Sequence, residues 1–111
     1  MVIDFSKIVQ QEIEGFKGGK GILKTQNFTD DKCKIMFSEL MPGASTGLHV
    51  HERNSEIIYI LKGQATFHYD DNTEKVSEGQ VHYCPMGHQH YMMNETKLPL
   101  VYFAIVPEHH L

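Results

Sequence analysis

The chain has 111 residues, of which 41% are hydrophobic and 22% charged, the size and composition of one globular domain. The formal net charge of −4 argues against a basic nucleic-acid-binding surface, and no apolar run is long enough to span a membrane. The first residues lack a signal-peptide pattern, and two cysteines, Cys33 and Cys84, are too few for a disulfide framework. We therefore expect a reduced, cytoplasmic protein that binds neither nucleic acid nor membrane.

The N-terminal segment, residues 1–21, has an apolar half and a glycine-rich half. Spacing of Ile3, Phe5, Ile8 and Ile13 is compatible with a short helix that begins near Ser6 or with an irregular strand. Residues 15–21 contain four glycines but lack the Gly-Lys-Ser/Thr ending of a phosphate-binding loop. This stretch predicts a loop or the edge of a strand.

From residue 22 onward, the sequence predicts short strands separated by turns. Gly, Pro, Asn and Asp residues mark the turns, and no helical period is evident after residue 20. Many short strands with regular turn signals are typical of a β-sandwich or a closed β-barrel. The predicted strands cover residues 22–25, 34–40, 56–61, 64–69, 80–84, 90–93 and 98–106.

Alternation along these strands predicts which side chains face inward. In strand 64–69, Phe67 falls on one face and His68 on the other, which we expect to be the solvent side. In strand 34–40 both faces are apolar: Met36 and Leu40 share one with Ser38, whereas Ile35 and Phe37 share the other. Because a small barrel has one interior, the second face needs a cover from the N-terminal segment or a second subunit. The pattern therefore favours a homodimer.

Histidine is unusually frequent, and six of the eight histidines lie between positions 49 and 90. His49 and His51 are two residues apart, so on a strand both imidazoles point to the same side. Glu56 begins a strand whose same-face partners are isoleucines, where an unpaired carboxylate would be costly. His90 begins a face shared with Met92. Three imidazoles and one carboxylate suit one divalent transition-metal ion (Mn, Fe, Ni, Co or Zn).

Two stretches around these residues resemble the two sequence motifs of the cupin superfamily. Residues 43–63 carry the first pattern, and residues 79–94 carry the second. The matching positions are Gly43, His49, His51, Glu56 and Gly63 in the first, and Gly79, Pro85, Gly87, His90 and Asn94 in the second. Ten matches at fixed offsets are not a chance event, since each residue type has a background frequency of about 7% or less. Only 15 residues separate the motifs, which is similar to compact bacterial single-domain cupins.

The resemblance implies one cupin domain over residues 1–111, an all-β double-stranded β-helix (jelly-roll) barrel. It also implies that His49, His51, Glu56 and His90 are the metal ligands, that the glycines and Pro85 form turns, and that Asn94 is a structural or pocket-edge residue. Such cupins commonly form dimers.

Other residues near the motifs are candidates for catalysis or ligand contact. His82 and Tyr83 lie on the strand before Pro85, and alternation lets one of them face inward. His88 and Tyr91 flank His90. An inward His or Tyr would be a candidate general acid or base, although the pattern favours a rim or packing role for most of them. Arg53 and Asn54 could contact a substrate, but the pattern favours a solvated loop. We expect Cys84 to be an inert buried thiol. His109 and His110 form a chain end that could reach a metal, although such an end is more often mobile.

A cupin barrel does not fix the chemistry. One hypothesis is a metal-dependent enzyme, a dioxygenase, isomerase or lyase, acting on an oxygenated small molecule such as a sugar derivative or organic acid. The alternative is a non-catalytic module that binds or senses such a small molecule through the metal. The complete ligand set favours an enzyme, and the sequence has no helix-turn-helix pattern that would indicate a transcription factor.

Overall fold

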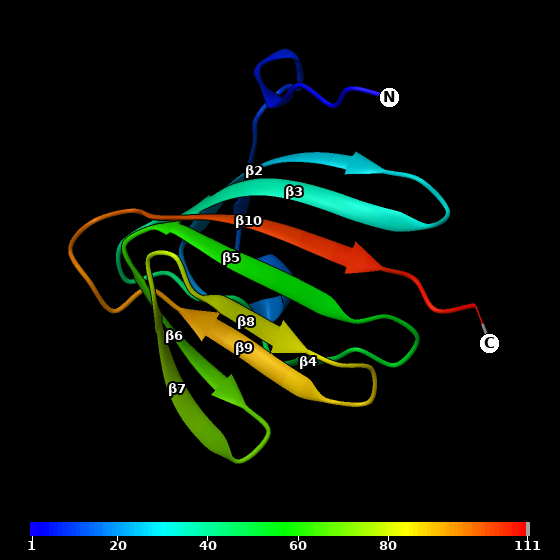
Figure 1. Ribbon diagram of the computed structural model, residues 1–111. Coiled ribbons are helices and arrows are strands. Elements are labelled where there is room, and N and C mark those ends of the chain that lie inside the picture. Colours follow the sequence, from blue (N-terminus) through cyan, green and yellow to red (C-terminus); the bar gives the residue numbers. More distant parts are fainter. Residues whose placement is uncertain (111) are drawn as a thin grey trace.

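The computed structural model describes residues 1–110, which form two antiparallel β-sheets facing each other (Figure 1). The larger sheet has the order β1-β2-β3-β10-β5-β8 and the smaller one β4-β9-β6-β7. The larger sheet contains β1 (Gln11–Glu14), β2 (Ile22–Thr29), β3 (Cys33–Leu40), β10 (Leu100–Pro107), β5 (Glu56–Lys62) and β8 (Val81–Cys84). The smaller contains β4 (His49–Val50), β9 (Gln89–Met93), β6 (Gln64–Tyr69) and β7 (Asn72–Ser77). This confirms the all-β double-stranded β-helix barrel.

All seven predicted strands are present, with ends that move by a few residues. Two strands, β4 and β7, were not predicted, and β1 lies in the N-terminal segment, where an irregular strand was one of two alternatives. In β7 only Val76 is buried, so the strand has no alternating apolar face to mark it. It pairs with β6 through a tight turn in which Asp70 adopts a left-handed conformation, with φ of 51°. Short and edge strands of this kind take their conformation from pairing with a neighbour rather than from their own sequence.

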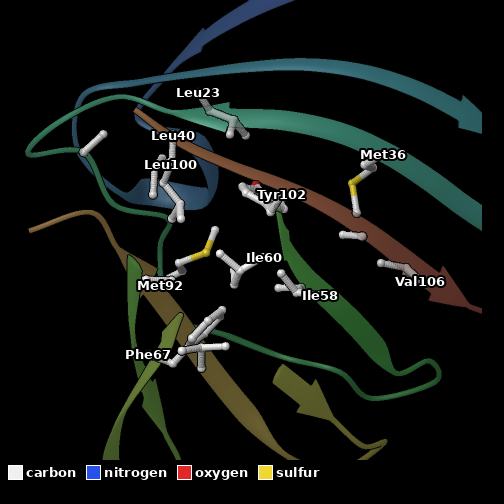
Figure 2. Packing of buried hydrophobic residues seen from close by; sticks show 14 residues of the cluster. Leu23, Met36, Leu40, Ile58, Ile60, Phe67, Met92, Leu100, Tyr102 and Val106 are labelled. Atoms are coloured by element: carbon white, nitrogen blue, oxygen red, sulfur yellow. The ribbon is translucent and has the colours of Figure 1, made fainter. Parts of the chain in front are cut away.

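The interior lies between the inner faces of the two sheets (Figure 2). Ile58 and Ile60 of β5 and Phe67 of β6 are fully or almost fully buried, as the alternation predicts. The buried apolar residues are Leu23, Met36, Leu40, Ala44, Ile58, Ile60, Ala65, Phe67, Val76, Met92, Leu100, Tyr102, Ala104 and Val106. Ser38 shares this interior, also as predicted.

The N-terminal segment covers part of the outer face of the larger sheet. The predicted short helix is the 3₁₀ turn η1 (Phe5–Lys7). The Phe5 ring packs on Phe37 and Phe103, with ring centroids 5.6 and 6.1 Å apart. Gln26 Nε2 fixes the segment by donating hydrogen bonds to the carbonyls of Phe5 and Ile8 at 2.7 and 2.9 Å. Of the two predicted covers for Phe37, the N-terminal segment is therefore the one present within the chain.

The glycine-rich stretch forms a second 3₁₀ turn, η2 (Phe16–Gly18), beside the loop that leads to β4. Gly47 donates a hydrogen bond to the Phe16 carbonyl at 2.9 Å, and a Cβ at position 47 would collide with the Lys17 carbonyl. A side chain at position 47 would therefore push this turn away from β4. No helix among residues 1–110 combines the length and apolar character needed to cross a membrane.

Candidate metal centre

The four predicted ligands come from three strands and meet inside the barrel. His49 lies on β4 opposite His90 of β9, where the two Cα positions are in register. His51 follows β4, and its backbone bonds to both ends of the 87–88 turn: His51 N–H to the His88 carbonyl, and Gly87 N–H to the His51 carbonyl. Glu56 is the first residue of β5. Strand pairing thus aims all four side chains at one point.

The donor atoms are close enough to share one ion. Nε2 of His90 lies 3.0 Å from Nε2 of His51 and 3.1 Å from Nε2 of His49. Glu56 Oε1 lies 3.0 Å from the His90 nitrogen, 3.2 Å from the His51 nitrogen and 3.9 Å from the His49 nitrogen. Adjacent ligands around an ion with bonds of about 2.1 Å lie about 3.0 Å apart in an octahedron. The shorter spacings fit such adjacent positions.

The charge state of the cluster also suits a cation. Burial alone would raise the pKa of Glu56, but its close contacts with the imidazoles of His49, His51 and His90 outweigh this effect and hold that pKa well below its usual range. Burial lowers the pKa of His90 despite its contact with Glu56. At neutral pH the group therefore contains an ionised carboxylate and a neutral His90, the forms that coordinate a metal.

Hydrogen bonds to the opposite ring nitrogens turn two imidazole lone pairs toward the centre. His49 Nδ1 donates to the Gly47 carbonyl at 2.8 Å, which leaves its Nε2 unprotonated. His51 Nδ1 faces Asn54 Oδ1 at 2.6 Å, and Asn54 Nδ2 in turn donates to Glu108 at 3.1 Å. This second bond orients the amide so that its oxygen accepts from His51. Both rings are thus held as metal-ready tautomers.

A chain of hydrogen bonds from Glu74 through the buried His82, here called the relay, orients the ring of His90 in the same way. Glu74 Oε1 accepts a hydrogen bond from His82 Nδ1 at 2.7 Å. In neutral His82 the other nitrogen, Nε2, then accepts from His90 Nδ1 at 3.0 Å. The His82 side chain is 0% exposed and stacks on Phe67 with ring centroids 3.7 Å apart. Burial lowers the pKa of His82, which favours the neutral form that this relay requires.

The donor set therefore fits a divalent transition-metal ion. Three imidazole lone pairs and a carboxylate oxygen converge, and without a cation these electron-rich atoms would repel one another at such spacing. The same four residues form the only group of metal-ligating side chains identified in residues 1–110.

The cluster opens into a cavity of about 380 Å³ between the two sheets. Its wall combines apolar and polar side chains. The apolar part comprises Phe16, Leu23, Met36, Val50, Ile58, Phe67, Met92, Tyr102 and Val106. The polar part, besides the four ligands, comprises Lys17, Thr25, Asn27, Lys34, Thr46, Glu52, Arg53, Asn54 and Glu108. A cavity of this size matches sites for small-molecule ligands.

The structure separates the three candidate acid–base residues. His82 faces inward but lies behind His90, whereas Tyr83 faces outward and is 55% exposed. His88 lies on the turn before β9, where it contacts Asp70 at 2.6 Å and Tyr69 at 3.2 Å. None of the three lines the cavity. Their catalytic roles stay predictions, and the geometry gives His82 a positioning role.

The other candidates divide between the mouth and the outer surface. Arg53 and Asn54 line the cavity, and their contact with a ligand stays a prediction. Tyr91 stacks on His68 on the outer face, with ring centroids 5.1 Å apart. His109 Nε2 lies 3.0 Å from Ser55 Oγ. His110 Nε2 donates to the Asp31 carbonyl at 3.0 Å, so neither terminal histidine joins the cluster.

Sequence reasoning missed Glu74, Gly47 and Glu108, each of which supports a ligand indirectly. Glu74 lies on β7, which was not predicted, so nothing in the sequence placed it near His82. Asn94, by contrast, has the predicted structural role: its Nδ2 donates to the carbonyls of Leu40 and Leu98 at 2.9 and 2.8 Å.

The barrel and its three-histidine, one-glutamate cluster define a class of protein, and sequence comparison agrees. The family model for the cupin domain matches residues 36–106. The chain therefore belongs to the cupin family.

Similarity to a curated sequence and to a solved structure, both from Thermotoga maritima, extends over almost the whole chain. The first, an oxalate-binding protein, is 30% identical over 112 aligned positions, covering 96% of this chain and 93% of the relative. The second is the crystal structure of a predicted oxalate decarboxylase, with a TM-score of 0.90, 30% identity and coverage of 97% and 99% of the two chains. A cupin sugar phosphate isomerase from Silicibacter pomeroyi has a TM-score of 0.80 at 16% identity, over 97% of this chain and 76% of that one, and is similar in fold alone.

Proposed function

We propose that the protein holds one divalent transition-metal ion on His49, His51, Glu56 and His90 and uses it to bind a small organic acid. The observation that carries this proposal is the convergence of four correctly oriented donor atoms at one end of a cavity. When bound, such an ion attracts ligand oxygen atoms and neutralises their charge. A six-coordinate ion would keep two positions for these oxygens, and the oxalate-binding relative supports an acid as the ligand.

The chain's own residues then assist the ligand. Lys17, Lys34 and Arg53 line the cavity beside Glu52 and Glu108, and three positive charges against two negative ones favour an anion. The apolar wall excludes water and so strengthens the attraction between these charges and the ligand. Asn54 keeps His51 oriented while lying at the mouth itself.

Catalysis is a second candidate, in which the bound acid is turned over by an oxygenase, isomerase or lyase reaction. Similarity to the structure described as a predicted oxalate decarboxylase favours it. The position of His82, Tyr83 and His88 away from the cavity favours binding without turnover. Binding is therefore the function that the site supports best.

Calorimetric titration tests the proposal. Protein loaded with Mn²⁺, Co²⁺, Ni²⁺ or Zn²⁺ should bind oxalate, whereas protein stripped with a chelator and dialysed should not. His49→Ala should bind neither metal nor oxalate, and the outward-facing His68→Ala should behave as the wild type. Oxalate binding that is independent of metal would contradict the proposal. Product analysis by NMR after incubation with oxalate distinguishes turnover from binding.

We also propose that the protein is a cytoplasmic homodimer. Both cysteines are free thiols, in keeping with a reducing compartment. The outer face of β5 and β8 exposes a continuous apolar patch, defined as Ile57, Tyr59, Leu61, Val81 and Tyr83. Pairing places Ile57 beside Tyr83 and Tyr59 beside Val81, so these side chains form one surface. A second copy of the chain is the occupant that we propose.

A further inference from the structure

The cavity extends well beyond the ligand cluster, along the inner face of the larger sheet. Strand registers place Ile58, Ala104, Met36 and Asn27 opposite one another on β5, β10, β3 and β2. Ile58 is two residues from the ligand Glu56 on the same face of β5. Neighbouring strands lie about 4.8 Å apart, so this row spans about 14 Å from β5 to β2. It begins beside the metal cluster and ends at an amide.

The middle of the row is apolar. Ile58 and Met36 both line the cavity, and Ala104 between them is small and fully buried. Val106 lines the cavity in the adjacent row, next to Glu56. The part of a ligand that extends from the metal cluster along this wall therefore contacts apolar side chains first. Oxalate, with only two carbons, would leave this part of the cavity unused.

The far end of the row presents hydrogen-bond donors. The Thr25 hydroxyl donates to Asn27 Oδ1 at 2.6 Å, and because it has one proton, Ser38 Oγ must be the donor in its 2.7 Å contact with Thr25. This chain of bonds occupies the Asn27 oxygen, and since Asn27 lines the cavity, we expect its Nδ2 to be the group available to a ligand. Lys34, one position along the same face of β3 from Met36, also lines the cavity. The Asn27 amide and the Lys34 ammonium group can both donate hydrogen bonds to an acceptor on the ligand.

We propose that the preferred ligand is an elongated acid with a metal-binding head, a short hydrocarbon body on Ile58 and Met36, and an oxygen acceptor at its far end near Asn27. A 2-oxo or 2-hydroxy dicarboxylic acid of about six carbons has this chemistry. The inference rests on the proposed function, since the head requires the metal. It goes further in assigning a selectivity site to β2, on the far side of the same sheet from Glu56.

A ligand series on metal-loaded wild-type protein tests the inference without a mutation. Calorimetry should give affinities that increase from oxalate to 2-oxohexanoate to 2-oxoadipate. Each methylene buried on the wall should increase the affinity by a factor of at most about four. The terminal carboxylate of 2-oxoadipate should add about tenfold more through Asn27 and Lys34. Oxalate binding as tightly as 2-oxoadipate would overturn the inference while leaving the proposed function intact; metal-independent binding of every acid would overturn the proposed function itself.

Asn27→Asp sharpens the test, because it keeps the shape and the oxygen that accepts from Thr25 but replaces the N–H donors with a second, charged oxygen. Asn27→Asp should lower the affinity for 2-oxoadipate by tenfold or more and leave the affinities for oxalate and for the metal unchanged. Thr29→Val, at the exposed end of the same strand, is the matched control and should change nothing. Equal loss for all three acids in Asn27→Asp would contradict the assignment.

Discussion

Replacing His82 with phenylalanine should weaken metal binding, although His82 is not one of the four ligands. His82 Nε2 accepts the Nδ1 proton of His90 at 3.0 Å, and this bond keeps His90 Nε2 unprotonated. A phenyl ring retains the packing on Phe67 but offers no acceptor. The proton of His90 is then buried without a partner, which costs about 1–3 kcal/mol, and moving it to Nε2 would block the metal-binding lone pair.

Metal affinity falls in either state of His90, with its Nδ1 proton buried without a partner or with the proton moved to Nε2. Loss of a bond that supports a metal-binding histidine typically lowers metal affinity 10–100-fold, or about 1.4–2.7 kcal/mol. Competition with a chromogenic chelator measures the affinity for Zn²⁺. In the wild type, ¹⁵N NMR of the imidazoles should show Nδ1 of His90 protonated, and in His82→Phe the proton should shift toward Nε2.

Two control variants separate positioning from folding. His68→Phe makes the same substitution on the outer face, beside Tyr91, and should bind Zn²⁺ as the wild type does. Glu74→Gln retains a carbonyl oxygen for His82 Nδ1 and should lose less affinity than His82→Phe. A His82→Phe protein with unchanged affinity, within about twofold, would refute the relay.

Three further predictions concern the thiols, the apolar patch and the loop around Asn94. Burial raises the pKa of Cys84 to about 12, so at pH 8 only about one thiol in 10⁴ is ionised. Iodoacetamide should therefore label Cys33 in the native protein and both cysteines after denaturation. Labelling of Cys84 in the native protein would contradict its burial. Val81→Asp or Tyr83→Ser should convert the dimer into monomers by light scattering at micromolar concentration, whereas a monomeric wild type would remove the dimer proposal. Asn94→Ala should lower the free energy of unfolding by about 2–3 kcal/mol in urea melts, because two carbonyls lose their donors; a change below about 0.5 kcal/mol would count against that role.

The sequence predicted the strands with strong alternation and the convergence of the four side chains of the candidate metal cluster. Ile58, Phe67 and Met36 face inward because each lies on an alternating strand, where the side-chain direction follows from the backbone. His49 and His51 meet His90 because both motifs lie on paired strands. These features depend on local patterns, which a single sequence contains.

Features that depend on the pairing of distant, weakly patterned segments were beyond prediction. Glu74 reaches His82 only because β7 folds back beside β6, and β7 has one buried residue. Asn27 faces the cavity because β2 continues past the predicted end at residue 25 to Thr29, held by its pairing with β3. Neither contact has a signature at short range. The contact that supports the His90 ring through His82, and the position of Asn27 in the cavity wall, are therefore evident only from the structure.

Metal analysis measures whether the four residues together hold one metal ion. Protein purified without chelators or affinity-tag metals, then saturated with Mn²⁺ or Zn²⁺ and desalted, should contain about one ion per chain by mass spectrometry. His90→Ala should contain close to none while keeping its β-sheet circular dichroism. Wild-type protein that retains no metal, or a His90→Ala variant that retains as much as the wild type, would contradict the assignment of the site.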